Sequence, residues 1–185
     1  MTQSGHCNSG GNVSSRKNYA CYFVFLLVFV VVGCQRAPSD NTTANKEVVR
    51  QWFAALDAQD FDALTKLMDE QFVIPARIID GADRAVGRNA AFKVIRGFYR
   101  SFPDYTHDIK EMIAEGDRVA VRVVLRGTQL GEYSGVAPTG RQVSYAGTYM
   151  ATVIDGALTE VWSLDDEINL LSQLGMELVP VSRDR

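Results

Sequence analysis

Apolar residues recur every three or four positions in three stretches between residues 45 and 103, which is the spacing of one buried helix face. Asn45, Asp60 and Asn89 stand where they can cap the N-termini of these three predicted helices. Pro103 ends the third helix. The inward positions of the three helices are Val49, Trp52, Phe53 and Leu56, then Phe61, Leu64, Leu67 and Met68, then Phe92, Ile95, Tyr99 and Phe102.

Beyond residue 104 the apolar positions alternate with a period of two, which predicts antiparallel strands. A shorter apolar stretch at about 72–79 predicts another strand, and Pro75 places it at an edge or a bulge. A last helix with Ile168, Leu171 and Leu174 inward stops at Gly175. The four long strands are predicted at about 105–113, 119–128, 142–154 and 158–166.

Helices followed by a run of long antiparallel strands predict the α+β class. We expect a curved antiparallel sheet that forms a cone, packed by three helices from the N-terminal half and closed by a short C-terminal helix. Gly147 and the strand that contains Pro75 favour the curvature. The domain should cover residues 45–178, with a tail at 179–185, and its cone should enclose a pocket for a small ligand.

Asp155-Gly156, between two alternating runs, is a strong signal for a two-residue hairpin turn, and such a turn sets the strand register. The register then places Tyr149 opposite Trp162, and Tyr145 opposite Asp166. The predicted pocket face carries aromatic side chains with embedded acids: Tyr145, Gly147, Tyr149, Ala151, Glu160, Trp162, Leu164 and Asp166. The predicted outer face carries Thr148, Met150 and Val161 and suits solvent or a partner subunit.

A carboxylate at Asp166, beside Trp162 and Leu164, would lose hydration and suit acid/base chemistry near neutral pH. Tyr145 could then donate a hydrogen bond to an enolate or carbonyl oxygen. Asp166 has an alternative role as the N-cap of the following helix. Tyr145, Tyr149 and Trp162 could instead be core residues that pack across the strands. Glu160 could be the partner of an arginine.

The segment around Gly116 predicts a second hairpin, whose loop length the sequence leaves open. A three-residue loop places Tyr105, His107, Ile109 and Ile113 on the apolar face. A two-residue loop would place Asp108 and Lys110 there, so burial favours the first. His107 is then either a hydrogen-bonded core residue or a second proton-transfer candidate.

The N-terminus resembles a bacterial lipoprotein signal peptide over residues 1–33. Arg16 and Lys17 precede an apolar run, 20–33, of 14 residues, which is shorter than the roughly 20 that span a bilayer. Val31-Val32-Gly33-Cys34 resembles a lipobox, which implies that Cys34 is lipidated and becomes the mature N-terminus. An uncleaved anchor and a plain signal peptide are the alternatives. All three export the domain, and residues 34–44 would form a flexible tether.

Composition excludes several classes of site. No cysteine follows Cys34, so the domain has neither an internal disulfide nor a thiolate zinc site. The two histidines are His6 and His107, so a site with two histidines is excluded from the mature chain and no metal is expected. The formal net charge of −3 offers no basic surplus for nucleic acid.

Several segments, taken in order over about residues 45–176, resemble the SnoaL-like polyketide cyclase family of the nuclear-transport-factor-like cone superfamily. They are Gly87-Arg88-Asn89-Ala90, Phe102-Pro103-Asp104, 115–122, Gly127-Thr128, 138–141, Glu160-Val161-Trp162 with the Asp166 that follows, and Gln173-Leu174-Gly175. The resemblance implies ring closure without a metal or cofactor, an acid at Asp166 and a hydrophobic ligand. Together with the character of the predicted outer face, it also implies a homodimer. Gln129 stands where the family commonly has histidine, which counts against conserved chemistry.

Two functions follow from these observations. The first is a cofactor-free enzyme of the cyclase or isomerase type, acting on a hydrophobic carbonyl compound through Asp166, His107 and Tyr145. Trp162, Tyr149, Glu160, Leu164 and Gln129 would then contact the ligand. The second is a non-catalytic ligand-binding or interaction lipoprotein that uses the same pocket. Either would reside in the bacterial cell envelope, held at the membrane by the lipid on Cys34 alone.

Overall fold

The computed structural model describes residues 41–75, 85–177 and 179. The chain divides into two units, Met1–Ser39 and Asp40–Arg185, and every described residue belongs to the second. The predicted signal peptide, Cys34 and most of the predicted tether therefore lie outside the described residues. So do residues 76–79 of the strand predicted at about 72–79 and all of the predicted tail except Val179.

The described residues contain four helices: α2 (Thr42–Asp57), α3 (Phe61–Leu67), α4 (Arg88–Ser101) and α5 (Glu167–Gln173). Asp60 caps α3 as predicted, because its Oδ1 accepts hydrogen bonds from the amides of Asp62 and Ala63. The other two predicted caps were wrong. Asn45 lies inside α2, where its buried Nδ2 donates to the carbonyl of Gly116 at 3.0 Å, and the N-cap of α4 is Gly87 rather than Asn89.

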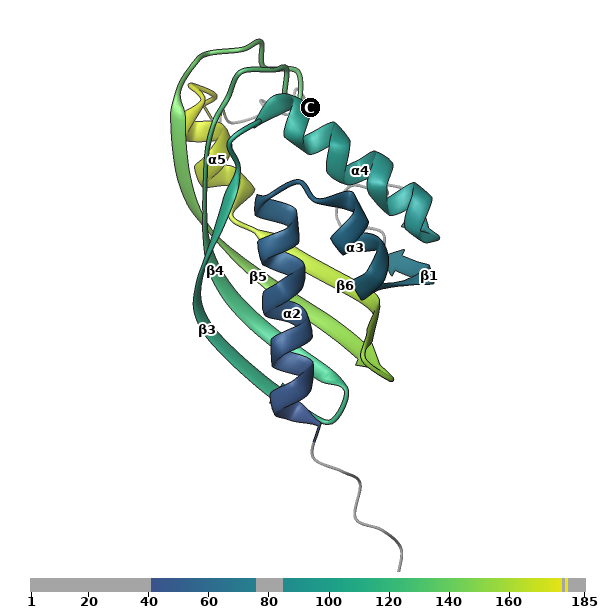
Figure 1. The fold of residues 1–185 in the computed structure, drawn as a ribbon. Coiled ribbons are helices and arrows are strands. Elements are labelled where there is room, and N and C mark those ends of the chain that lie inside the picture. The colour runs from purple at the N-terminus through teal and green to yellow at the C-terminus, as the bar shows by residue number, and fades with distance from the viewer. Residues whose placement is uncertain (1–40, 76–84, 178, 180–185) are drawn as a thin grey trace, which may run out of the picture. The chain divides into compact units, whose positions relative to one another are not determined.

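In the part of the chain that the structure describes, six strands form one sheet in the order β2-β1-β6-β5-β4-β3. The four long strands are antiparallel neighbours, as predicted, whereas β1 pairs with β6 in parallel, so the sheet is mixed. Helices α2, α3 and α4 lie on one face of the curved sheet, as Figure 1 shows. The strand bounds are β1 Met68–Ile74, β2 Ala85–Val86, β3 Thr106–Glu115, β4 Arg118–Thr128, β5 Gln142–Ile154 and β6 Ala157–Asp165.

The β5–β6 hairpin turns at Asp155-Gly156, and Ile154 faces Ala157 as predicted. The register shifts soon after the turn. Val153 faces Leu158, but Thr152, the next residue of β5, faces Glu160, so Thr159 of β6 has no partner in β5. Thr159 is the extra residue of this β-bulge. From the bulge onward the predicted register was wrong by one residue.

The β3–β4 hairpin also carries a bulge. Its loop is the two-residue Gly116-Asp117, because Glu115 pairs with Arg118, so the three-residue loop was wrong. The register then shifts between Ile109 and Glu111, with Lys110 as the extra residue. The bulge returns His107 to the buried face, where it pairs with Leu125, as expected. Ile113, by contrast, is 63% exposed on the other face.

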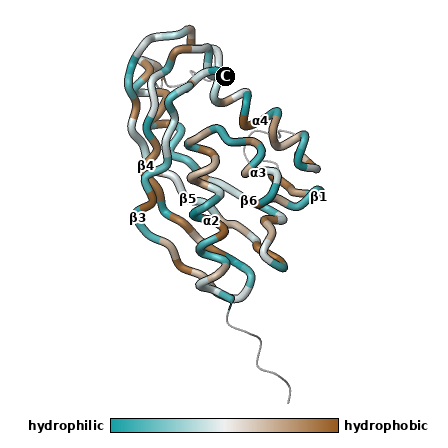
Figure 2. Tube along the Cα trace, in the orientation of Figure 1, coloured by the Kyte–Doolittle hydropathy of each residue, from teal (hydrophilic) through white to brown (hydrophobic). Residues whose placement is uncertain are grey.

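The core lies between the helices and the inner face of the sheet. In Figure 2 the colour changes repeatedly along β3 and β4, because hydrophobic and hydrophilic residues alternate there. Val119, Val121, Val123 and Leu125 of β4 are buried almost completely. Val161, which was expected on the outer face, is also buried on the inner face because of the Thr159 bulge. No helix within the described ranges is both long and apolar enough to cross a membrane.

Candidate functional site

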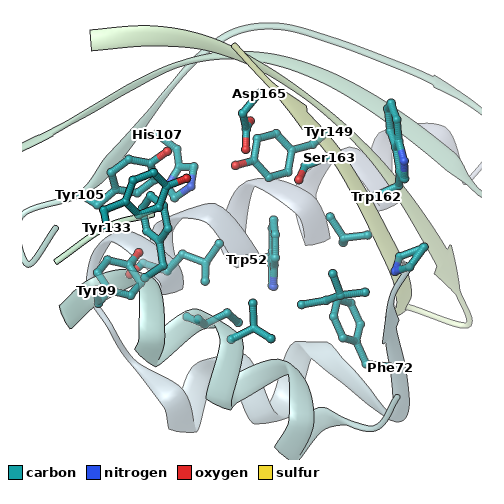
Figure 3. Close-up of a pocket in the computed structure, with 17 residues that line it drawn as sticks. Trp52, Phe72, Tyr99, Tyr105, His107, Tyr133, Tyr149, Trp162, Ser163 and Asp165 are labelled. Atoms are coloured by element: carbon teal, nitrogen blue, oxygen red, sulfur yellow. The ribbon is translucent and has the colours of Figure 1, made fainter. Parts of the chain in front are cut away.

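A cavity of about 250 Å³ lies between the helices and the inner face of the sheet. One part of its wall is apolar and comes from α2, β1 and α4. The other part carries polar groups from β3, β5 and β6, from Tyr99 of α4 and from the loop residues Tyr105 and Tyr133, so hydrophobic contact and polar chemistry meet in one space (Figure 3). The apolar wall includes Trp52, Leu56, Phe72, Ile74, Ile95 and Phe98. The polar groups are those of Tyr99, Tyr105, His107, Tyr133, Tyr149, Ser163 and Asp165.

Asp165 is the last residue of β6, and the shifted register turns it into the cavity. It pairs with Gly147 of β5, and a Cβ atom built on Gly147 would lie 2.5 Å from the Asp165 Oδ1. The glycine therefore leaves the room that the carboxylate occupies. Figure 3 shows Asp165 beside Tyr149 and Ser163 on one wall of the cavity.

His107 of β3 forms a pair with Asp57, the last residue of α2. Its Nδ1 lies 2.6 Å from the Asp57 Oδ1, and its backbone N–H donates to the same carboxylate at 3.1 Å. The imidazole packs against Phe53, Tyr105 and Tyr149, with ring centroids 5.0–6.0 Å away. The His107 side chain is only 5% exposed, so the pair holds a fixed orientation in the cavity wall.

Four tyrosines surround these groups. The Tyr105 and Tyr145 hydroxyls are 2.6 Å apart, and the Tyr99 hydroxyl donates to the Leu56 carbonyl. Burial raises the pKa of Tyr99, Tyr105, Tyr145 and Tyr149, and the nearby Asp165 carboxylate raises the pKa of Tyr149 further. All four phenols therefore stay neutral at physiological pH and keep their protons.

The structure separates the predicted pair of Tyr145 and Asp166. Asp166 is exposed and caps α5, accepting a hydrogen bond from the Asn169 amide at 3.1 Å, so its alternative role as N-cap is the one observed. Tyr145 does lie on the inner face and is buried, but its hydroxyl forms a hydrogen bond with that of Tyr105 and it does not line the cavity. Gly147, not Tyr145, faces the acid of β6.

Of the residues predicted to contact the ligand, some line the cavity and others do not. Tyr149 lines the cavity and pairs with Ser163. Trp162 also lines it, although its cross-strand partner is Met150 rather than Tyr149. Glu160 and Leu164 lie on the outer side of β6, opposite Thr152 and Thr148, and neither lines the cavity. The Thr159 bulge is the cause in both cases.

Gln129 lies outside the cavity and holds the loop between β4 and β5. Its side chain is completely buried, and its amide N–H groups donate to the carbonyls of Val136 and Ala137. Its Oε1 accepts from both the amide and the hydroxyl of Thr139. The expected ligand contact was therefore wrong, because every hydrogen-bonding position of this carboxamide is occupied by the loop.

Sequence reasoning missed Asp165 and Asp57. Asp165 was hidden by the bulge, and a wider reading would have considered both members of Asp165-Asp166. Asp57 is 50 residues from His107, and only the packing of α2 on β3 brings the two together. In the described part of the chain no cluster of three or more His, Cys, Asp or Glu side chains could hold a metal.

Comparisons with known proteins agree on the fold. The family model of SnoaL-like polyketide cyclases matches residues 46–174. A SnoaL-like polyketide cyclase candidate from Jannaschia sp. CCS1 is 24% identical, with a TM-score of 0.68, over 77% of this chain and 99% of that one. A comparison with curated proteins found no match.

Two structures from Streptomyces are somewhat closer in sequence. IdmH, a candidate polyketide cyclase from Streptomyces antibioticus, is 29% identical, with a TM-score of 0.64, over 71% of this chain and 99% of that one. AclR, a candidate hydroxylase from Streptomyces galilaeus, is 28% identical, with a TM-score of 0.63, over 72% of this chain and 97% of that one. With its α+β cone, its cavity and a family match over most of the described domain, this chain belongs to the SnoaL-like polyketide cyclase family.

Proposed function

We propose that the domain binds a hydrophobic carbonyl compound and moves protons on it without a cofactor, as a cyclase or isomerase does. The observation that carries this proposal is the carboxylate of Asp165 in an otherwise largely apolar cavity. Asp165 takes a proton from the carbon next to the carbonyl group, and a neutral phenol such as Tyr149 donates a hydrogen bond to the enolate oxygen. The protonated Asp165 then returns the proton to carbon.

Proton exchange on a model ketone tests this proposal. In heavy water, wild-type protein should speed the replacement of the α-hydrogens of 1-tetralone by deuterium, followed by NMR. Asp165→Asn should reduce the rate to that of buffer, because the amide keeps the shape but cannot take the proton. Asp166→Asn is the matched control: it alters the next residue, outside the cavity, and should retain the wild-type rate. Equal rates for D165N and wild type would refute the role of Asp165.

A second candidate, a binding protein without turnover, is favoured by two observations. Gln129, at the position where relatives commonly have histidine, is engaged in the loop, and Asp166 is engaged in capping α5. This candidate predicts that 1-tetralone binds with equal affinity to wild type and D165N while neither protein speeds exchange. The same samples therefore distinguish the two functions.

We also propose that Cys34 carries lipid and holds the domain at the membrane of a bacterial envelope. The support is the order of basic residues, a 14-residue apolar run and Val31-Val32-Gly33 before the cysteine. Cys34→Ser should move the domain to the soluble fraction after cell lysis. Membrane association that is unchanged in C34S would contradict lipidation.

The outer face of the sheet supports a further proposal, that two copies associate there. Met150 and Leu164 are 39% and 53% exposed on this face, with Thr148 between them. Sedimentation at micromolar concentration should give the mass of a dimer, and Met150→Glu should give a monomer. A monomeric wild type would contradict the proposal.

A further inference from the structure

The Asp57–His107 pair is a second polar centre of the cavity, separate from Asp165. Asp57 comes from the end of α2 and His107 from β3, whereas Asp165 comes from the end of β6. Figure 3 shows His107 beside Tyr105, and Asp165 beside Tyr149. A ligand that fills the cavity therefore meets two groups that can exchange protons.

The contacts of Asp57 determine which nitrogen of His107 carries the proton. An ionised carboxylate only accepts hydrogen bonds, so the 2.6 Å contact requires a proton on the histidine Nδ1. The neutral imidazole then has a lone pair on Nε2. In the described part of the chain Nε2 makes no hydrogen bond, and it lies on the ring edge away from Asp57. This edge is the part of the ring that remains to line the cavity.

We infer that Asp57 is a positioning residue that makes the His107 Nε2 a proton acceptor, and that the ligand presents a hydroxyl group to it. Resting on the proposed function, this defines the ligand class as a hydroxy-substituted hydrophobic carbonyl compound, a phenol or an enol. Its carbonyl oxygen lies toward Tyr149 and its hydroxyl toward His107. Transfer of the hydroxyl proton to Nε2 forms an imidazolium and an oxyanion, and the reverse transfer restores both.

The charge of the Asp57 carboxylate stabilises the imidazolium that this transfer forms. The aromatic rings of Phe53, Tyr105 and Tyr149 hold the imidazole in place and offer no competing charge. Asp108 is next to His107 in sequence, but it points to the other face of β3 and pairs with Lys110 and Arg126. Of Asp57 and Asp108, it is therefore Asp57 that contacts the ring and sets its tautomer.

The tautomer can be measured directly, because the chain has only two histidines. In the full chain with His6→Gln and ¹⁵N-labelled histidine, both ring nitrogen signals belong to His107. We expect a protonated Nδ1 and an unprotonated Nε2. Asp57→Asn should shift the population toward the Nε2–H tautomer, because an amide N–H can donate to Nδ1. Asp108→Asn removes the same charge from the other face and should leave the tautomer unchanged.

A pair of probes tests the ligand contact. 2-Naphthol has the hydroxyl proton that Nε2 would accept, and 2-methoxynaphthalene lacks it. Wild type should bind 2-naphthol about tenfold more tightly by fluorescence titration, the factor expected for one buried hydrogen bond. D57N should lose this preference, whereas D108N should keep it.

Two results would overturn the inference: an Nε2–H tautomer in the wild type, or equal binding of the two naphthalenes. Both readings come from wild-type protein, so a D57N variant that failed to fold would not prevent the test. The proposed function fails separately, when 1-tetralone exchange is absent although the preference for 2-naphthol is present.

Discussion

Gly147 and Asp165 face each other across β5 and β6, and the missing side chain of one makes room for the carboxylate of the other. A methyl group at Gly147 would also lie 2.8 Å from a methyl carbon of Leu125, so the space is closed on two sides. The position of the acid thus depends on a residue with no chemistry of its own.

Gly147→Ala should displace the Asp165 carboxylate and slow 1-tetralone exchange toward the rate of D165N. Overpacking at such a site costs about 1–3 kcal/mol, so the fold should survive. Gly97→Ala is the control, because a Cβ there meets nothing within 4 Å and the residue is in the middle of α4. An unchanged exchange rate in G147A, with the fold intact, would show that the carboxylate does not need this space.

Gln129→His, which introduces the residue expected from the family resemblance, should destabilise the domain by about 2–4 kcal/mol. An imidazole has two nitrogens and cannot replace the two donated and two accepted hydrogen bonds of the buried carboxamide. Urea unfolding measures the loss. Thr139→Val removes one hydroxyl from the same network and should cost less. Retained stability in Q129H would mean that the loop does not depend on this side chain.

Asp166→Ala should cost about 1 kcal/mol of unfolding free energy, because α5 loses its N-cap. Asp166→Asn should cost close to nothing, since asparagine also caps well. Denaturant titration of the two variants beside wild type gives the comparison. Equal losses in D166A and D166N would indicate that the charge, rather than the cap, is what matters.

The buried tyrosines predict a loss of stability in alkali. An unfolded tyrosine ionises near pH 10, whereas the folded pKa of Tyr99, Tyr105, Tyr145 and Tyr149 is raised, mainly by burial. Above pH 10 the unfolded state therefore binds fewer protons than the folded state, and stability falls as pH rises. Each phenol should contribute about 1.4 kcal/mol per pH unit.

Urea unfolding between pH 8 and pH 11 measures this slope, and stability should be flat until pH approaches 10. Tyr145→Phe should reduce the slope above pH 10 by one phenol's share, whatever it costs at neutral pH through the lost contact with Tyr105. A slope that is identical in Y145F and wild type would contradict the raised pKa of Tyr145.

Much of the fold could be predicted because it depends on local patterns. The alternation over 142–154 coincides with the observed β5, and Asp155-Gly156 forms the expected turn. The Asp60 cap also follows from a few neighbouring residues. These features need no knowledge of distant parts of the chain.

The site was less predictable, because distant contacts determine it. The Thr159 bulge lies where β6 pairs with β1 as well as β5, and the β1–β6 pairing is itself irregular. The bulge turned Asp165 inward and Leu164 outward, against the expectation from the turn. Asp57 meets His107 only through helix packing on the sheet, for which the sequence carries no local signal.

Side chains alternate between the two faces of β6, so the number of residues between the Asp155-Gly156 turn and the site decides which side chains face the cavity. The Thr159 bulge adds one residue to that number. With the extra residue Thr159, Val161, Ser163 and Asp165 lie on the inner face of the sheet; without it, Leu164 and Asp166 would take the places of Ser163 and Asp165. Insertion or loss of a single residue in this hairpin can therefore change which acid of Asp165-Asp166 faces the cavity, and replace Ser163 by Leu164, while the fold persists. When two family members are compared, the residue equivalent to the acid of the cavity is therefore identified from the strand pairing, not from its position in the sequence alone.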